Sequence, residues 1–196
     1  MMHAVENESQ LIAEACQGSP TAFEALVKTY ESPVKRMLYG MTQDIHFTQD
    51  LCQETFLAAY RALPRMDSNE LRFAPWLYRI ALNLVRTEWR RRKHITLVPF
   101  STSWGSNEDQ FEELIEDSLV NEDRFEERIV KQDLVRRVLA QLPASSALCL
   151  LLDAQGFTYR EIAEILHDSL AAVRSRLARA RQGFQRIYSN LDREER

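Results

Sequence analysis

Five arginines lie between residues 174 and 186, with no acidic residue among them. Guanidinium groups keep their positive charge and match phosphate oxygens, so this run suits contacts with a nucleic-acid backbone. The alternative interpretation is a solvated, arginine-rich helix face. Such a face usually mixes both signs of charge, because opposite charges four residues apart stabilise each other. We therefore favour DNA binding for this segment.

No other chemistry stands out along the 196 residues. There is no nucleophile–base pair, no phosphate-binding glycine loop, and no cysteine or histidine spacing typical of a metal site. Cys16, Cys52 and Cys149 lie far apart within apolar helical patterns, which indicates buried, inert thiols. We expect a protein that is not an enzyme and that has no catalytic residue, metal or cofactor.

The arginines belong to the second of two predicted helices. Thr158 and Glu161 have the spacing of a capping box, and an apolar stripe of helical period follows them. His167 and Asp168 interrupt that stripe, and Ser169 can cap the next helix. The sequence therefore predicts a helix-turn-helix over residues 158–177.

The second of these helices separates an apolar face from a face of mostly small residues. The apolar side chains recur at steps of three and four, and we expect them to pack inward: Val173, Leu177, Ala180, Phe184 and Ile187. Ala171, Ser175, Ala178 and Gln182 lie on the opposite face, with arginines on both flanks. Small side chains let a helix lie deep in the major groove while the flanking arginines reach phosphates.

The net charge of −4 hides opposite local charges. Residues 86–93 carry five basic residues and one acid, and residues 174–186 carry five basic residues and none. Residues 107–127, between them, hold ten acids and one arginine. Local fields decide what binds where, so two basic patches flank an acidic segment. That segment is either a solvated spacer or an autoinhibitory segment that folds back onto the basic patches.

Helical periodicity and a low content of glycine and proline, 5 and 6 residues, predict an all-α protein. The periodicity is lost after residue 93. We expect a helical domain at residues 1–93, a flexible acidic linker at 94–123, and a second domain with the helix-turn-helix at 124–196. No apolar stretch approaches the ~20 residues that span a bilayer, and the first residues lack a signal-peptide pattern. We expect a cytoplasmic protein without membrane insertion.

Two predicted helices of the first domain carry candidate binding surfaces. One begins at Thr48 or Asp50 and has a polar face beside its apolar one, which suits either solvent or a partner protein. The other begins near Pro75 and carries a basic stripe. Trp76 and Trp89 lie beside this stripe, where each either packs in the core or stacks on bases of a melting strand.

Three stretches, in this order, make the chain similar to the extracytoplasmic-function (group-four) sigma factors of bacterial RNA polymerase. DLCQETF, residues 50–56, resembles the signature of their core-binding helix. WLYRIALNLVRTEWRRRK, residues 76–93, resembles the helix that contacts the −10 promoter element. Residues 142–181 resemble region four, whose second helix reads the −35 element. The resemblance covers about residues 10–93 and 124–188.

This resemblance implies a factor that binds core polymerase and directs promoter recognition, melting and transcription initiation. The implied partners are the β′ clamp and β flap of the polymerase, promoter DNA and an anti-sigma factor. The implied contacts are Asp50, Gln53, Glu54 and Phe56 for core polymerase; Asn83, Arg86, Trp89, Arg90 and Arg91, with the loop 65–73, for the −10 strand; and Ala171, Arg174, Ser175, Arg176 and Arg179 for the −35 duplex.

The chain departs from the family pattern at two places. Thr87 stands where the family often has an acid, and the turn of the helix-turn-helix has His167 and Asp168 in place of the usual glycine. We expect one of these two residues to adopt a positive φ, or the turn to differ. A helix-turn-helix regulator that does not deliver polymerase is the rival interpretation, and a helical adaptor whose arginines bind an acidic protein is a third.

Overall fold

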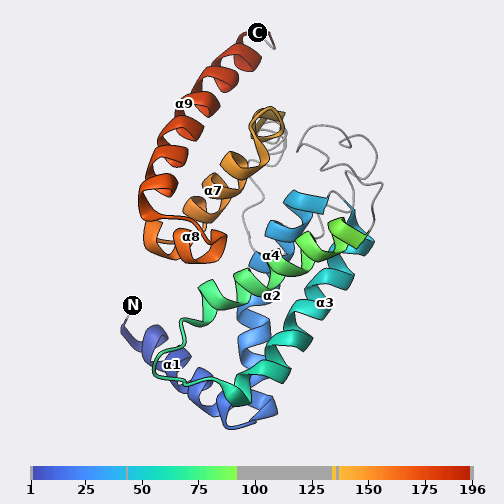
Figure 1. The fold of residues 1–196 in the computed structure, drawn as a ribbon, viewed down its shortest axis with the longest axis vertical. Coiled ribbons are helices and arrows are strands. Elements are labelled where there is room, and N and C mark those ends of the chain that lie inside the picture. Colours follow the sequence, from blue (N-terminus) through green and yellow to red (C-terminus); the bar gives the residue numbers. More distant parts are fainter. Residues whose placement is uncertain (1, 43, 92–133, 136, 195–196) are drawn as a thin grey trace, which may run out of the picture. The chain divides into compact units, whose positions relative to one another are not determined.

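The computed structural model describes residues 2–42, 44–91, 134–135 and 137–194. The chain divides into two compact units, Met1–Arg92 and Lys93–Arg196, and each is described by itself. Every regular element within the described ranges is helical (Figure 1). The all-α fold expected from the sequence is therefore confirmed. The acidic linker lies outside the described residues.

Unit 1 contains the helices α1 (Met2–Cys16), α2 (Pro20–Thr42), α3 (Ile45–Ala62) and α4 (Phe73–Arg91), with a single 3₁₀ turn, η1 (Leu63–Arg65), after α3. Helix α2 packs against each of the other three helices, and α3 also packs against α4. The core between them is made of large apolar side chains, among them Leu26, Met37, Leu38, Leu77 and Tyr78.

Pro33 could open a separate helix, because proline suits the first turn of a helix best. Instead, α2 continues through Pro33. A proline inside a helix removes a backbone hydrogen bond and costs roughly 3 kcal/mol. Leu26, Val34, Met37 and Leu38 are buried on the same side of α2, before and after the proline. Burial of each large apolar side chain contributes roughly 1.5–3 kcal/mol, which outweighs the local cost.

Helix α3 begins earlier than the predicted Thr48 or Asp50. It begins at Ile45, and the extended Asp44 before it accepts a hydrogen bond from the Phe47 amide at 2.9 Å. Aspartate is among the strongest N-cap residues, because its carboxylate satisfies a free amide of the first turn. Thr48 lies inside the helix and is buried, with its hydroxyl 2.7 Å from that of Thr42.

Unit 2 contains α7 (Ala144–Ala154), α8 (Tyr159–Leu166) and α9 (Leu170–Glu194), which pack against one another. The predicted inward face of α9 is confirmed for Val173, Leu177 and Ala180, which are buried. Farther along α9, Phe184 and Ile187 are partly buried against Leu134, Val138 and Leu142. The described part of residues 124–141 thus packs against the second half of α9.

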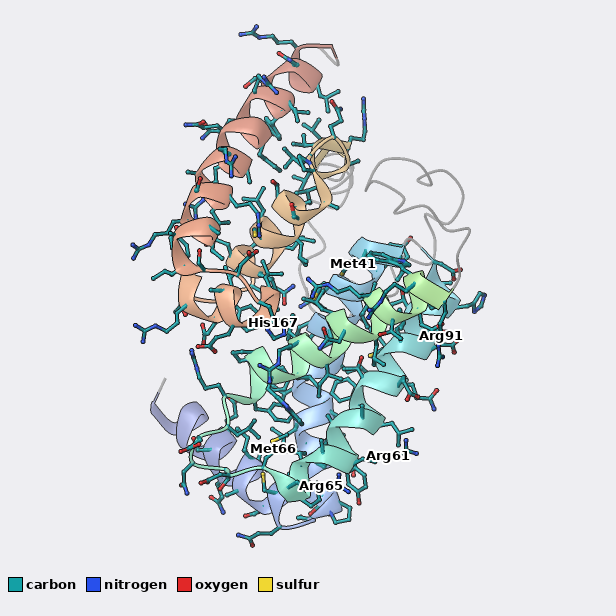
Figure 2. All side chains as sticks on the ribbon, in the orientation of Figure 1. Met41, Arg61, Arg65, Met66, Arg91 and His167 are labelled. Carbon is teal, nitrogen blue, oxygen red and sulfur yellow. The ribbon has the colours of Figure 1, made fainter. Side chains whose placement is uncertain are left out.

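The turn between α8 and α9 has the features that the sequence predicts. Thr158 and Glu161 form a complete capping box at the start of α8. His167 ends that helix in the left-handed conformation, with φ 56° and ψ 44°, where glycine is the usual residue (Figure 2). Ser169 Oγ then accepts a hydrogen bond from the Ala172 amide at 3.1 Å and caps α9.

The conformation of His167 generates a prediction about stability. A left-handed backbone costs a residue with a Cβ roughly 1–2 kcal/mol, whereas glycine carries an entropic cost of roughly 0.5–1 kcal/mol. We expect His167→Gly to raise the free energy of unfolding of unit 2 by up to about 1 kcal/mol. Calorimetric unfolding of the full chain measures this change. His167→Ala is the control, because it keeps the Cβ and should not stabilise. A glycine variant that unfolds at a lower temperature than wild type contradicts the prediction.

Candidate nucleic-acid and polymerase interfaces

The exposed face of α9 is opposite its buried stripe. Ala171, Arg174, Ser175, Ala178 and Arg179 are all exposed, as the helical period predicts. Nitrogen-tipped side chains project from this helix away from α7 (Figure 2). Two short side chains, Ala171 and Ser175, therefore lie one turn apart with arginines beside them. This arrangement is typical of a helix that enters the major groove.

The five arginines of residues 174–186 are not equivalent, although the sequence pattern treats them alike. Arg176 is half-buried, and its Nη1 donates a hydrogen bond to Asp168 Oδ2 at 2.5 Å. The carboxylate of Asp168 raises the pKa of Arg176. Arg181 pairs with Asp153 at 2.7 Å and donates to the hydroxyl of Tyr159 at 3.0 Å.

Arg174, Arg179 and Arg186 differ from these two. All three are exposed, and none of them forms an ion pair with another residue of the described ranges. Arg179 makes only a weak hydrogen bond, from Nε to the Ser175 carbonyl at 3.3 Å. A guanidinium group that no carboxylate neutralises can give its charge to a phosphate. The sequence pattern identified the arginine run, but the tertiary contacts determine which members form ion pairs.

Helix α3 presents a second exposed surface. Asp50, Gln53 and Glu54 are exposed, as the sequence predicts for its polar face. Phe56 differs, because its side chain is only 7% exposed and its ring meets that of Phe23 in a T-shaped contact at 6.5 Å. The structure places Phe56 in the core, where its ring has little surface left for a partner. Its role as a contact for polymerase stays a prediction.

Two large apolar side chains extend the surface of α3. Leu57 is 39% exposed and Tyr60 is 42% exposed, although both are large enough to gain from burial. The centroid of the Tyr60 ring lies 5.0 Å from that of the Phe23 ring, and this contact restricts the rotation of the tyrosine side chain. Sequence reasoning missed Tyr60. Its spacing of seven residues from Gln53 and three from Leu57, on one helix face, was the available signal.

Helix α4 places its basic stripe on the side away from the core. Asn83 and Arg90 are exposed, while Arg86 and Trp89 are partly buried. Arg91 pairs with Glu88 at 3.1 Å. Trp76, for which the sequence left two alternatives open, is buried with its ring 5.9 Å from that of Phe73. Of the two tryptophans, only Trp89 therefore remains a candidate for stacking on a base.

Neither a metal site nor a membrane helix is seen in the described parts of the chain. In those ranges no three of the histidine, cysteine, aspartate and glutamate side chains are grouped so that they could hold a metal ion. No described helix is long and apolar enough to cross a membrane. The candidate binding features that we describe are the exposed surfaces of α3, α4 and α9.

Comparison with known proteins gives these surfaces a context. Residues 26–95 match the family sigma-70 region 2, and residues 132–182 match the family sigma-70, region 4. The chain is 30% identical over 189 residues to the ECF RNA polymerase sigma-E factor of Haemophilus influenzae, and the match covers 89% of this chain and 92% of that relative.

Two solved structures have the same fold. CnrH in complex with the cytosolic domain of CnrY matches 94% of this chain and 98% of its own, with a TM-score of 0.64 and 24% identity. The sigma factor RpoE in complex with the anti-sigma factor NepR from Bartonella quintana matches 85% and 96%, with a TM-score of 0.59 and 18% identity. At these identities the two structures bear on the fold alone.

The two helical units and the exposed basic face of α9 define a helix-turn-helix protein that binds DNA. Taken with the matching families and the sigma-E relative, the chain belongs to the extracytoplasmic-function (group-four) sigma factors of bacterial RNA polymerase. The resemblance inferred from three sequence motifs is confirmed. As a sigma factor, the protein binds core polymerase and directs promoter recognition, melting and transcription initiation.

The environments of the cysteines generate a prediction about reactivity. Burial raises the pKa of all three thiols, that of Cys52 to about 12. Cys16 is partly exposed, whereas Cys52 and Cys149 are buried. Because the thiolate is the nucleophile, a raised pKa lowers reactivity at neutral pH.

We expect Ellman's reagent to modify one thiol, Cys16, in the folded chain, and all three in denaturant. Raising the pH from 7 to about 9 should accelerate the reaction of Cys16, because its thiolate fraction grows, while Cys52 stays protonated. Cys16→Ser is the control and should remove the fast phase. Reaction of Cys149 at the rate of Cys16 contradicts the burial that we describe.

Proposed function

We propose that this sigma factor uses its three exposed surfaces for three separate contacts: α3 for core polymerase, α4 for the −10 strand and α9 for the −35 duplex. The observation that carries the proposal is the division of α9. One face holds the buried Val173 and Leu177, and the other presents Ala171 and Ser175 between unneutralised arginines. A helix whose only role is to cover the core does not require short side chains between exposed arginines on its outer face.

The proposed core-binding surface combines charge with exposed apolar area. Asp50, Gln53 and Glu54 offer acceptors and negative charge, and Leu57 and Tyr60 lie beside them on α3. Protein interfaces are enriched in tyrosine and place apolar side chains at the centre of a polar rim. We therefore add Leu57 and Tyr60 to the residues that contact the β′ clamp and leave out Phe56.

The proposed −10 surface lies on α4. Asn83 and Arg90 are its exposed members, and Arg86 and Trp89 lie beside them, half-buried. Arginines can follow the backbone of a single strand while a tryptophan ring stacks on an unpaired base. Arg91 contributes less in this proposal, because Glu88 already neutralises part of its charge. Residues 65–73, from the end of η1 to the start of α4, complete the surface.

The proposed −35 surface divides its contacts between bases and phosphates. Ala171 and Ser175 lie against base edges, where a methyl group or a hydroxyl can be read. Arg174 and Arg179 bind phosphates on either side. Arg176, which the family resemblance also assigns to DNA, forms an ion pair with Asp168 and differs from these two arginines.

The remaining assignments follow from the role of a sigma factor. Residues 1–93 act as the core and −10 domain, 94–123 as the linker and 124–196 as the −35 domain, which also meets the β flap. The protein acts in the cytoplasm as a non-catalytic factor without a cofactor. Because RpoE of Bartonella quintana is held by the anti-sigma factor NepR, we propose an anti-sigma factor as a further partner here.

The proposal for α3 is tested by Gln53→Ala combined with Glu54→Ala. Both side chains are exposed, so the free energy of unfolding should change by no more than about 0.5 kcal/mol. Loss of two interface side chains should weaken binding to core polymerase by roughly tenfold. Fluorescence titration of labelled sigma factor with core measures this affinity.

A matched control exists on α1. Gln10 and Glu14 form an exposed hydrogen-bonded pair at 2.9 Å, so Gln10→Ala with Glu14→Ala removes the same two residue types elsewhere on unit 1. The control should bind core like wild type. If the α3 variant also binds like wild type, α3 is not the core-binding surface.

The proposal for α9 is tested by comparing Arg179→Ala with Ser175→Ala in the polymerase holoenzyme. Loss of one phosphate contact should weaken binding about equally for all −35 sequences and reduce the slope of log affinity against log salt by about 0.9. Loss of the serine hydroxyl should change the preference among −35 variants and leave that slope unchanged. Competition binding at several salt concentrations measures both. Identical effects of the two substitutions would rule out this division of contacts.

A further inference from the structure

The Arg176 side chain contacts two other elements of unit 2 from α9. Arg176 extends from the second turn of α9, and its Nη1 lies 2.5 Å from Asp168 Oδ2 in the turn before α9 and 3.8 Å from Cys149 Sγ on α7. The side chains of Arg176 and Asp168 are 23% and 31% exposed. A pair this far from solvent is screened less than a surface pair. It therefore links α9 to the turn and to α7.

Asp168 is engaged through its backbone as well. Its amide donates to the Ala163 carbonyl of α8 at 3.0 Å. The residue before it, His167, is in the left-handed conformation, and the residue after it, Ser169, caps α9. The direction in which α9 leaves α8 is set by these three residues. Arg176, which lies on α9, forms its ion pair with the middle residue of the three, Asp168.

We propose that Arg176 is a positioning residue for −35 recognition: it acts through Asp168 to fix the angle of α9, and it does not bind a phosphate itself. This inference rests on the proposed assignment of α9 to the −35 duplex. It moves Arg176 from the DNA contacts that the family resemblance implies to the supporting structure of the turn.

A positioning role has a signature that differs from a phosphate contact. Ala171 and Ser175 are short, so they reach base edges only if the backbone of α9 is accurately placed, and hydrogen bonds weaken steeply outside a narrow range of distance and angle. Arg174 and Arg179 have long, flexible side chains that follow a phosphate through a small displacement. A small rotation of α9 therefore lowers discrimination between base sequences and leaves the number of phosphate contacts unchanged.

The same unit provides an internal comparison in Arg181. This residue also pairs with an aspartate, Asp153, but the two side chains are 48% and 26% exposed. Neither residue belongs to the turn between α8 and α9. Exposed pairs contribute little, because water and salt screen them. Arg181→Gln removes the same charge from the same helix and should reduce discrimination less than Arg176→Gln does.

The experiment uses holoenzyme made from core polymerase and the full-length sigma factor. Duplex promoter fragments carry either the −35 sequence that the wild-type holoenzyme selects from a randomised library or a scrambled −35 sequence. Discrimination is the ratio of the two dissociation constants, and each constant is measured over a range of salt. Arg176→Gln and Asp168→Asn break the pair from opposite ends. Arg179→Gln is the matched control for charge, and circular dichroism confirms that each variant is folded at the assay temperature.

The positioning role predicts that Arg176→Gln and Asp168→Asn each lower discrimination by about tenfold, the effect of one lost base contact. The salt slope should equal that of wild type in both, and the double variant should lose no more than either single one. If Arg176 instead binds a phosphate, Arg176→Gln will behave like Arg179→Gln, while Asp168→Asn will keep its discrimination. That result overturns the inference, as does unchanged discrimination in both variants. If Arg176→Gln does not fold, the discrimination of Asp168→Asn decides between the two roles, because asparagine has nearly the same shape as aspartate.

Failure of the underlying assignment is recognised separately. If the wild-type holoenzyme shows no preference for any −35 sequence, or if Ser175→Ala leaves the preference unchanged, α9 does not read the −35 duplex. If those two measurements behave as proposed and only the Arg176 and Asp168 variants do not, the positioning role alone is wrong.

Discussion

The recognition surface of unit 2 depends on the burial of one apolar stripe along α9. Val173, Leu177 and Ala180 are almost completely removed from water, and each of the larger two contributes roughly 1.5–3 kcal/mol. Because a helix turns 100° per residue, burial of this stripe directs Ala171 and Ser175 outward. At 25 residues, α9 is long enough for its second half to pack against Val138 and Leu142 as well. The same stripe thus anchors the helix at both ends and defines which face of α9 is exposed, the face that we propose meets DNA.

Unit 1 follows the same physical rule with different consequences. On α4 the buried stripe contains Leu77, Ala81 and Val85, which directs Asn83 and Arg90 outward. Each helix has one face that the core requires, and the opposite face is available for binding. Burial stabilises large aromatic rings, and Phe56 and Trp76 are both buried. Tyr60 differs, because it stays 42% exposed.

This rule explains how much of the structure could be predicted from the sequence. Helical period predicts the inward faces of α4 and α9, and local hydrogen-bonding chemistry predicts the Thr158 capping box. The absence of the family's usual glycine left a positive φ in the turn as one of two alternatives, and His167 adopts it. The passage of α2 through Pro33 could not be predicted, because it depends on burial that local sequence does not reveal. The same holds for the pairing of Arg176 with Cys149 and Asp168, which are 27 and 8 residues away along the chain. Helical period places arginines on a flank, and only tertiary contacts decide which of them are neutralised.

That last point changes the electrostatic description of the binding face. The run at residues 174–186 has five positive charges by sequence, but Asp168 and Asp153 neutralise two of them within unit 2. The field that a phosphate backbone meets along α9 comes mainly from Arg174, Arg179 and Arg186. Because the release of counterions from DNA scales with the number of phosphates that a protein neutralises, our proposal for α9 implies a salt dependence below that of five contacts. The Arg176 pair links α9 to the turn before it. The three arginines without an ion pair in the described ranges are, in our proposal, the main source of electrostatic attraction to DNA.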